Sequence, residues 1–209
     1  ASIGIFVFPN DGTDFDSLLR AADVAMYEAK SAGRNTFRFF RAEMNDNAVS
    51  RLELEEALRH AIAHGGLRLH YQPQFDLVSG HLVGYEALLY WNDPLLGEVP
   101  PSRFHPLAES TGLIVEIGRW ALHEACLQNQ RWVHEGVSEV PVAVRLSPLQ
   151  FKRGEVEREV ISALAESGLA PGLLELEVTE ELLADANGKI SLQLSALKQL
   201  GVRLAIDDF

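Results

Sequence analysis

The order of hydrophobic and polar residues along this chain follows two spacings, one typical of strands and one typical of helices. Short apolar runs bounded by glycine, proline or polar residues predict strands at residues 1–9, 36–40, 67–72, 81–89, 140–146, 173–178 and 202–207. Apolar residues three and four positions apart predict helices at residues 15–30, 42–64, 102–109, 114–135, 155–167 and 189–200. The chain is therefore expected to mix helices and strands throughout.

The sequence of these elements divides the chain into three parts. Residues 1–41 hold one helix between two strands, too little to bury a core alone, so this part is expected to be the end of a larger domain. Residues 42–66 form a charged helix that ends at Gly65 and Gly66, and we interpret it as a link between domains. Residues 67–209 alternate strands and helices, as a parallel sheet with crossover helices does.

The third part predicts an α/β fold with a mostly parallel sheet. A closed (β/α)8 barrel takes about 250 residues, whereas only about five strands fit between residues 67 and 209. We therefore expect an incomplete (β/α)8 (TIM-like) barrel. The chain also begins within a strand and ends on apolar and acidic residues, which favours a piece of a longer protein.

Composition and charge narrow the classes of function. Hydrophobic residues make up 47% and charged residues 23% of the 209 residues, which indicates a folded domain rather than a disordered chain. The 30 acidic and 18 basic residues leave a net charge of −12, which argues against binding of a nucleic-acid polymer or of an anionic membrane surface. No apolar run reaches the roughly 18–20 residues of a membrane-spanning helix. The single cysteine, Cys126, is expected in the core and fits a reducing, cytoplasmic location.

Acidic residues stand within or at the ends of three predicted strands. They are Glu86, Glu177 and the adjacent pair Asp207 and Asp208. The carboxyl ends of parallel strands form the active face of α/β folds, so these carboxylates are expected to converge. Divalent cations, which prefer oxygen ligands, would offset the repulsion between them. Alternatively, each acid is a solvated strand end or pairs with a neighbouring arginine.

Six motifs follow one another around these acids: Tyr71-Gln72-Pro73, Gly84-Tyr85-Glu86-Ala87-Leu88-Leu89, Pro101-Ser102-Arg103-Phe104, Ala108-Glu109, Leu174-Glu175-Leu176-Glu177-Val178-Thr179-Glu180 and Asp207-Asp208-Phe209. Together they resemble a known family, the EAL domain of bacterial cyclic di-GMP phosphodiesterases. Three earlier motifs resemble the C-terminal end of a GGDEF (diguanylate cyclase) domain: Ser2-Ile3-Gly4-Ile5, Ala25-Met26-Tyr27-Glu28-Ala29-Lys30 and Gly33-Arg34-Asn35. The chain is thus similar to a tandem GGDEF–EAL signalling protein, with the GGDEF end at residues 1–41, a linker helix at 42–66 and an EAL domain, truncated before its C-terminal part, at 67–209.

The resemblance implies an activity, a cofactor and partners. The family hydrolyses one phosphodiester bond of cyclic di-GMP to give a linear dinucleotide and uses Mg2+ or Mn2+. Its metal-binding and catalytic acids match Glu86, Glu177, Asp207 and Asp208, and its nucleotide-binding positions match Gln72 and Leu88. The expected partners are cyclic di-GMP, a second copy of the chain in a homodimer, and an upstream sensory domain.

Two residues depart from the family pattern. Tyr90 precedes Trp91 where the family has an arginine that contacts a phosphate of the ligand, and tyrosine lacks the charged, bidentate fork of arginine. Arg145 stands where the family has an asparagine metal ligand, and its side chain stays protonated because its pKa is roughly 12.5–13.8. We expect the Arg145 guanidinium to pair with Glu86 or Glu177 where a metal would lie. Alternatively, this side chain turns to solvent and only weakens the site.

Three functions are compatible with this pattern. The chain is an EAL phosphodiesterase whose turnover Arg145 and Tyr90 impair, or an EAL module that binds cyclic di-GMP without hydrolysis, or a scaffold that binds neither nucleotide nor metal. Binding without turnover separates the second function from the first, and absence of binding selects the third. The two substitutions favour impaired catalysis, because one affects the metal and the other affects the substrate phosphate.

Overall fold

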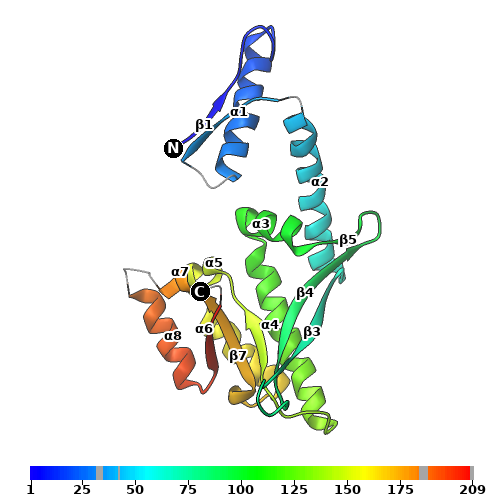
Figure 1. Ribbon diagram of the computed structural model, residues 1–209, viewed down its shortest axis with the longest axis vertical. Helices are drawn as coiled ribbons and strands as arrows, with labels where there is room; N and C mark the ends of the chain where they lie inside the picture. The colour runs from blue at the N-terminus through cyan, green and yellow to red at the C-terminus, as the bar shows by residue number, and fades with distance from the viewer. Residues whose placement is uncertain (32–34, 42, 184–187, 208–209) are drawn as a thin grey trace. The chain divides into compact units, whose positions relative to one another are not determined.

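The first 57 residues form a unit of their own, built on a two-stranded sheet. The structure is a computed structural model that describes residues 1–31, 35–41, 43–183 and 188–207 (Figure 1). In this unit, strands β1 (Ser2–Ile5) and β2 (Thr36–Phe39) pair in parallel, and helix α1 (Phe15–Ser31) packs against both. A Cβ atom at Gly4 would collide with the backbone of Ala22 and Met26, so only glycine lets the strand lie this close to α1.

Helix α2 (Glu43–His64) continues from the first unit into the second. In the first unit, the Arg51 guanidinium lies 4.6 Å from the ring centroid of Tyr27 on α1, a cation–π contact. In the second unit, Leu58 and Ala61 of the same helix are buried. A helix is thus present where the sequence predicts one, and the boundary between the two units falls within it, while its role as a linker stays a prediction.

A mixed sheet forms the centre of the second unit. Its strands are β3 (Leu67–Phe75), β4 (Leu82–Asp93), β5 (Gly97–Val99), β6 (Val142–Arg145), β7 (Leu174–Thr179) and β8 (Arg203–Asp207). Their order is β3-β4-β6-β7-β8, and β5 also pairs with β4. Strands β4, β6, β7 and β8 are parallel, whereas β3 and β5 run antiparallel to β4. The expected parallel sheet therefore gains an antiparallel hairpin at β3, because a short turn rather than a crossover of a dozen residues joins β3 to β4.

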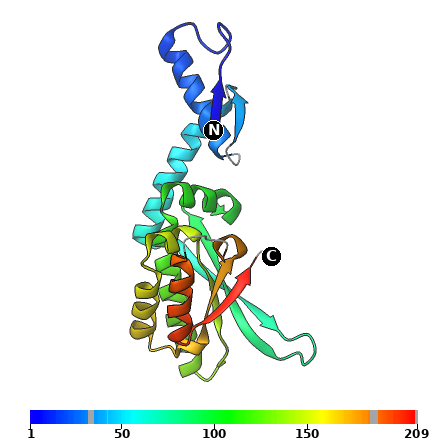
Figure 2. The same cartoon turned by 90° about the vertical axis from the view of Figure 1, so that its left-hand side faces the viewer.

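Helices cover one face of this sheet, and the core lies between the two layers. Helices α4 (Ile114–His134), α6 (Val156–Ser167) and α8 (Lys189–Gln199) lie along the same side of the strands (Figure 2). The strand residues buried beneath them are Val142, Val144, Leu174, Leu176 and Val178. Cys126 of α4 is also fully buried, as the sequence predicts.

Further helical elements flank the strands of the second unit. They are α3 (Pro101–Thr111) after β5, α5 (Pro148–Arg153) after β6, the single turn η1 (Pro171–Leu173) before β7, and α7 (Glu180–Leu183) after β7. The helix expected at residues 102–109 corresponds to α3. The sequence patterns did not predict β5, α5, η1 or α7, because elements of three to six residues contain too few apolar positions to show a period.

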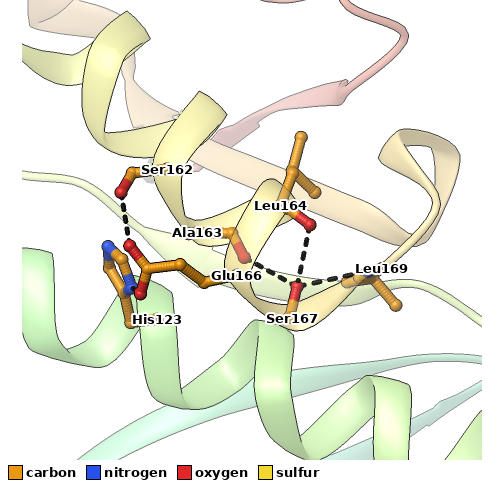
Figure 3. Close-up of polar contacts among 7 residues, drawn as sticks. All are labelled: His123, Ser162, Ala163, Leu164, Glu166, Ser167 and Leu169. Carbon is orange, nitrogen blue, oxygen red and sulfur yellow. Dashed lines mark hydrogen bonds and ion pairs between the residues drawn. The ribbon is translucent and has the colours of Figure 1, made fainter.

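Two ion pairs join α4 to α6. Arg119 Nε lies 3.0 Å from Glu159 Oε1, and one turn further along α4 His123 Nδ1 lies 3.2 Å from Glu166 Oε2. Figure 3 shows that the Glu166 carboxylate also accepts a 2.7 Å hydrogen bond from the Ser162 hydroxyl, and this bond, together with His123, holds the pKa of Glu166 below its usual range. The carboxylate, rather than the imidazole, stands between the other two groups. The arrangement therefore joins two helices and does not form the serine–histidine–acid relay of a hydrolase.

The buried amide of Asn129 ties together the segments that lead into two neighbouring strands. Its Nδ2 atom donates to the carbonyl oxygens of Val140, at 3.1 Å before β6, and of Leu173, at 3.0 Å before β7. Asn129→Ala leaves both carbonyls unpaired, so we expect the free energy of unfolding to fall by about 2 kcal/mol in urea denaturation. Gln130→Ala removes a less buried amide from the same helix and serves as the control, with a change below about 0.5 kcal/mol. Equal effects of the two substitutions would contradict this role.

Candidate active site

Strand pairing places three of the predicted acids and Arg145 on one face of the sheet. Glu86 on β4 pairs with Ala143 on β6, and Arg145 lies two residues after Ala143. Arg145 in turn pairs with Glu177 on β7. Asp207 on β8 pairs with the residue two positions after Glu177. Because side chains two residues apart point to the same face of a strand, the three acids and the arginine share one face.

The nucleotide-binding positions expected from the sequence lie on the same face. Gln72 on β3 pairs with Glu86, while Leu88 and Tyr90 follow Glu86 at intervals of two residues along β4. Leu88 and Tyr90 are half-buried, and Gln72 is exposed. The other face of the sheet carries the apolar core under α4, α6 and α8, so this polar face is turned away from those helices. Asp208, the remaining predicted acid, lies outside the described residues.

The charged side chains gather toward one end of the parallel strands. Arg145 is the last residue of β6, and Asp207 is the last residue of β8. Glu177 lies two residues before the end of β7. The carboxyl ends of parallel strands are where α/β folds build their sites, so these residues stand where a site is expected.

An ion pair joins the arginine to one of the expected metal ligands. Arg145 Nη2 lies 3.1 Å from Asp207 Oδ2, and both side chains are partly exposed. The positive charge also acts on Glu177, whose pKa it lowers. The guanidinium therefore lies among the acids, with Asp207 as its partner where the sequence had suggested Glu86 or Glu177. The side chain of Asp207 is 37% exposed, so the Arg145 guanidinium contacts this carboxylate and still remains in contact with water.

Glu177 is the buried acid of the cluster. The residue is only 7% exposed, and burial is the main reason that the pKa of its carboxyl is raised to about 7. The negative charges of Glu86, Asp207 and Glu175 raise this pKa further, and the charge of Arg145 opposes them. The Oε2 atom of Glu177 has no hydrogen-bond partner within the described part of the chain. A proton or a cation at this atom would relieve the repulsion among the carboxylates.

The donor set decides whether a divalent cation fits at this cluster. Mg2+ and Mn2+ prefer oxygen ligands such as carboxylates. The acids on this face supply such ligands, and Glu177 Oε2 has no hydrogen-bond partner in the described part of the chain. The guanidinium of Arg145 stands among them, however, and a permanent positive charge repels a second cation. In the described ranges, no three histidine, cysteine, aspartate or glutamate side chains are arranged as a metal site. The residues present therefore do not fit a divalent cation while Arg145 holds this position.

His70 and Arg68, which the sequence did not single out, are neighbours of Tyr90. His70 stacks on Tyr90, with ring centroids 4.0 Å apart and ring planes 20° apart. Arg68 is the cross-strand partner of Tyr90 in the antiparallel pair of β3 and β4. Both belong to the alternating series on β3 that also contains Gln72, and this alternation is the signal in the sequence that points to them.

Hydrogen bonds hold the segment directly after Arg145 in place. The Ser147 hydroxyl donates to Glu109 Oε1 of α3 at 3.2 Å, and it accepts from the backbone N–H of Leu149 at the start of α5. The side chain of buried Gln150 accepts from the backbone N–H of Ser147 at 3.0 Å, which completes a capping box. The chain is thus anchored two residues after Arg145, which limits the positions that the base of this side chain takes.

Known proteins match the whole length of the chain. The family model of the diguanylate cyclase GGDEF domain matches residues 1–36, and that of the EAL domain matches residues 55–209. The chain is 46% identical over 212 residues to the bifunctional diguanylate cyclase/cyclic di-GMP phosphodiesterase MucR of Pseudomonas aeruginosa, with 100% of this chain and 30% of MucR covered. It is 39% identical over 198 residues to the oxygen sensor protein DosP of Escherichia coli, with 95% of this chain and 25% of DosP covered. The chain thus spans between a quarter and a third of these relatives.

Solved structures share the fold. The structure of PaMucR phosphodiesterase in a c-di-GMP complex is 42% identical with a TM-score of 0.72, and the match covers 75% of this chain and 64% of that one. The FimX EAL domain of Pseudomonas aeruginosa bound to c-di-GMP has a TM-score of 0.65 over 74% of this chain and 61% of that one, and at 24% identity it shows the fold alone. These neighbours confirm the α/β fold of an incomplete EAL-type barrel.

The extent of each match also bears on how the chain is organised. The two units divide between residues 57 and 58, and the family models leave residues 37–54 between them. The boundaries expected at residues 41 and 66 stay predictions.

Among the described residues, no helix is both long enough and apolar enough to cross a membrane. The EAL match covers well over half of the sequence, so the chain belongs to the EAL domain family, with the end of a diguanylate cyclase GGDEF domain preceding that domain.

Proposed function

We propose that this chain binds cyclic di-GMP on the polar face of its sheet and hydrolyses it slowly or not at all. The relative MucR is named as a cyclic di-GMP phosphodiesterase, and the solved PaMucR structure is a c-di-GMP complex. The observation that carries the proposal is the 3.1 Å ion pair between Arg145 and Asp207. It places a permanent positive charge at the acids that would have to hold the metal for hydrolysis.

Binding is supported by the residues at the edge of the cluster. Gln72 carries an amide that donates and accepts hydrogen bonds, as recognition of a polar nucleotide requires. Leu88 is half-buried and offers apolar surface on the same face. Neither side chain depends on a metal. Binding through these two side chains therefore does not require the metal that hydrolysis requires.

Impaired turnover is supported by the two departures from the family pattern. Arg145 opposes a cation at the acids, as argued above from its contact with Asp207. Tyr90 replaces a charged fork by one hydroxyl group, and a charge-assisted hydrogen bond contributes about 1.5–3 kcal/mol. That loss corresponds to roughly ten- to a hundredfold in affinity for a phosphate at this position.

A second function, metal-dependent hydrolysis, is favoured by the acids themselves. Glu86, Glu177 and Asp207 share one face, and Glu177 Oε2 has no hydrogen-bond partner in the described part of the chain. This function requires the Arg145 side chain to leave Asp207 when Mg2+ or Mn2+ enters. A homodimer, an upstream sensory domain and a cytoplasmic location complete the proposal. The relative DosP is named as an oxygen sensor, which supports the sensory domain.

Two assays on the intact protein test the proposal. Calorimetry with cyclic di-GMP in the presence of EDTA measures binding, and chromatography after incubation with millimolar Mn2+ measures the linear dinucleotide. We expect binding in EDTA and no product over hours. Mn2+-dependent product that Glu86→Ala abolishes would show instead a working phosphodiesterase. Absence of binding in both the parent and Glu86→Ala would identify a scaffold.

A further inference from the structure

The polar face of the sheet contains few positive charges for a ligand that carries two phosphates. Among the described strand residues of this face, the arginines are Arg68 on β3, Arg145 on β6 and Arg203 on β8. Arg145 is engaged with Asp207. Arg203 begins β8, four residues before Asp207, and so lies away from the carboxyl ends of the parallel strands. Arg68 is the arginine that remains near the place where a phosphate is expected.

The register of the hairpin puts Arg68 directly opposite Tyr90. These residues are Cα partners in the antiparallel pair of β3 and β4. Cross-strand partners have their Cβ atoms about 4.5–5.5 Å apart, so the guanidinium of Arg68 can reach the space beside the Tyr90 ring. Because β3 runs antiparallel to β4, the start of β3 lies at the carboxyl end of β4. Arg68 therefore stands at the same end of the sheet as Tyr90, and it is exposed.

The Tyr90 ring also contacts a second residue of β3, His70. His70 stacks on it at 4.0 Å, and His70 is itself the cross-strand partner of Leu88. This stacking favours one orientation of the Tyr90 ring, on the His70 side of its cross-strand partner Arg68. Arg68 and Gln72 on β3, with His70 between them, and Tyr90 on β4 thus share the face on which the nucleotide is proposed to bind.

We propose that Arg68 supplies the phosphate contact that Tyr90 cannot make, so that the positive charge missing from β4 is provided across the hairpin by β3. This inference rests on the proposed binding of cyclic di-GMP. A guanidinium forms bidentate, charge-assisted hydrogen bonds to a phosphate, whereas the Tyr90 hydroxyl adds one neutral donor. Arg68 is thus a binding residue for the nucleotide and is separate from the acids and from Arg145.

Calorimetric titration of the intact protein with cyclic di-GMP in EDTA tests the inference. We expect Arg68→Ala to weaken binding roughly ten- to a hundredfold, and Arg68→Lys to weaken it less, because lysine keeps the charge and loses the fork. Arg203→Ala removes an exposed arginine from the same face at the other end of its strand, and we expect its affinity to stay within about twofold of the parent. The double variant Arg68→Ala/Tyr90→Arg should regain most of the lost affinity, which a merely structural role of Arg68 would not explain.

The outcomes separate this inference from the function on which it rests. If the parent and Arg203→Ala bind the nucleotide and Arg68→Ala binds it equally well, Arg68 makes no phosphate contact and the inference is wrong. If Arg68→Ala binds weakly and the double variant with Tyr90→Arg binds equally weakly, an arginine on β4 does not replace the one on β3. The inference is then wrong as well. If the parent binds no nucleotide, the proposed function fails and this inference fails with it. Thermal unfolding of each variant shows whether an affinity change comes from lost folding.

Discussion

Arg145→Asn is expected to turn the acidic cluster into a divalent-cation site and to increase the affinity for Mn2+ at least a hundredfold. The substitution removes a guanidinium that lies 3.1 Å from Asp207 and supplies an amide oxygen in its place. Two unit charges at 4 Å interact by about 4 kcal/mol at an effective dielectric constant of 20, and a divalent ion doubles this repulsion. A hundredfold change corresponds to about 2.7 kcal/mol, so it is a conservative expectation.

Calorimetric titration with Mn2+ measures this gain, and the turnover assay shows whether the bound metal also produces the linear dinucleotide. Arg145→Lys is the matched control, because it keeps one positive charge at the end of β6 and should bind Mn2+ as poorly as the parent. If Arg145→Asn binds Mn2+ no better than Arg145→Lys, the arginine does not block the metal, and the proposal of impaired turnover loses its main support.

The location of this cluster could be predicted from the sequence because it depends on strand order and alternation. The apolar residues around Glu86, Glu177 and Asp207 predict a strand at each of these positions. In a parallel sheet, such strands present their carboxyl ends on one side. Alternation along each strand then fixes which side chains share a face. These rules use only neighbours along the chain, so a single sequence is enough to apply them.

The pairing of Arg145 and the pKa of Glu177 could not be predicted in this way. Arg145 is in register with Glu177, yet its ion pair goes to Asp207 on the strand beyond. That choice depends on side-chain rotamers and on the exposure of each acid, which no pattern of residue types reveals. The sequence pattern also does not predict the antiparallel hairpin of β3 and β4, which puts Arg68 opposite Tyr90. Cross-strand partners follow from the length of a turn, which sequence boundaries give only approximately.

Glu177 should make the stability of the parent protein depend on pH. Its carboxyl has an ordinary pKa of 4.5 when exposed and a pKa of about 7 in the folded chain. A raised pKa means that the folded state holds the proton more tightly, so the contribution of this group to stability is lost as the pH rises from about 4.5 to 7. Glu177→Gln cannot lose a proton. We therefore expect its free energy of unfolding, relative to the parent, to increase by up to about 3 kcal/mol between pH 4 and pH 8.

Urea denaturation of parent and variant at a series of pH values in EDTA measures this difference. Glu180→Gln, which removes an exposed carboxylate three residues further on, is the control, and its difference from the parent should vary by less than about 0.5 kcal/mol over the same range. A Glu177→Gln difference that is flat with pH would contradict the prediction.

The arginine and the buried acid are coupled, which gives a sharper test of the same cluster. Arg145 lowers the pKa of Glu177, so its removal in Arg145→Asn should raise that pKa and steepen the loss of stability toward high pH. Mn2+ bound by this variant should restore stability at high pH, because a divalent cation replaces and exceeds the lost positive charge. The parent, whose acids already have Arg145, should gain little from Mn2+. A parent that Mn2+ stabilises as strongly as Arg145→Asn would show that the guanidinium leaves the acids without cost, and Arg145 would then no longer support the proposal of impaired turnover.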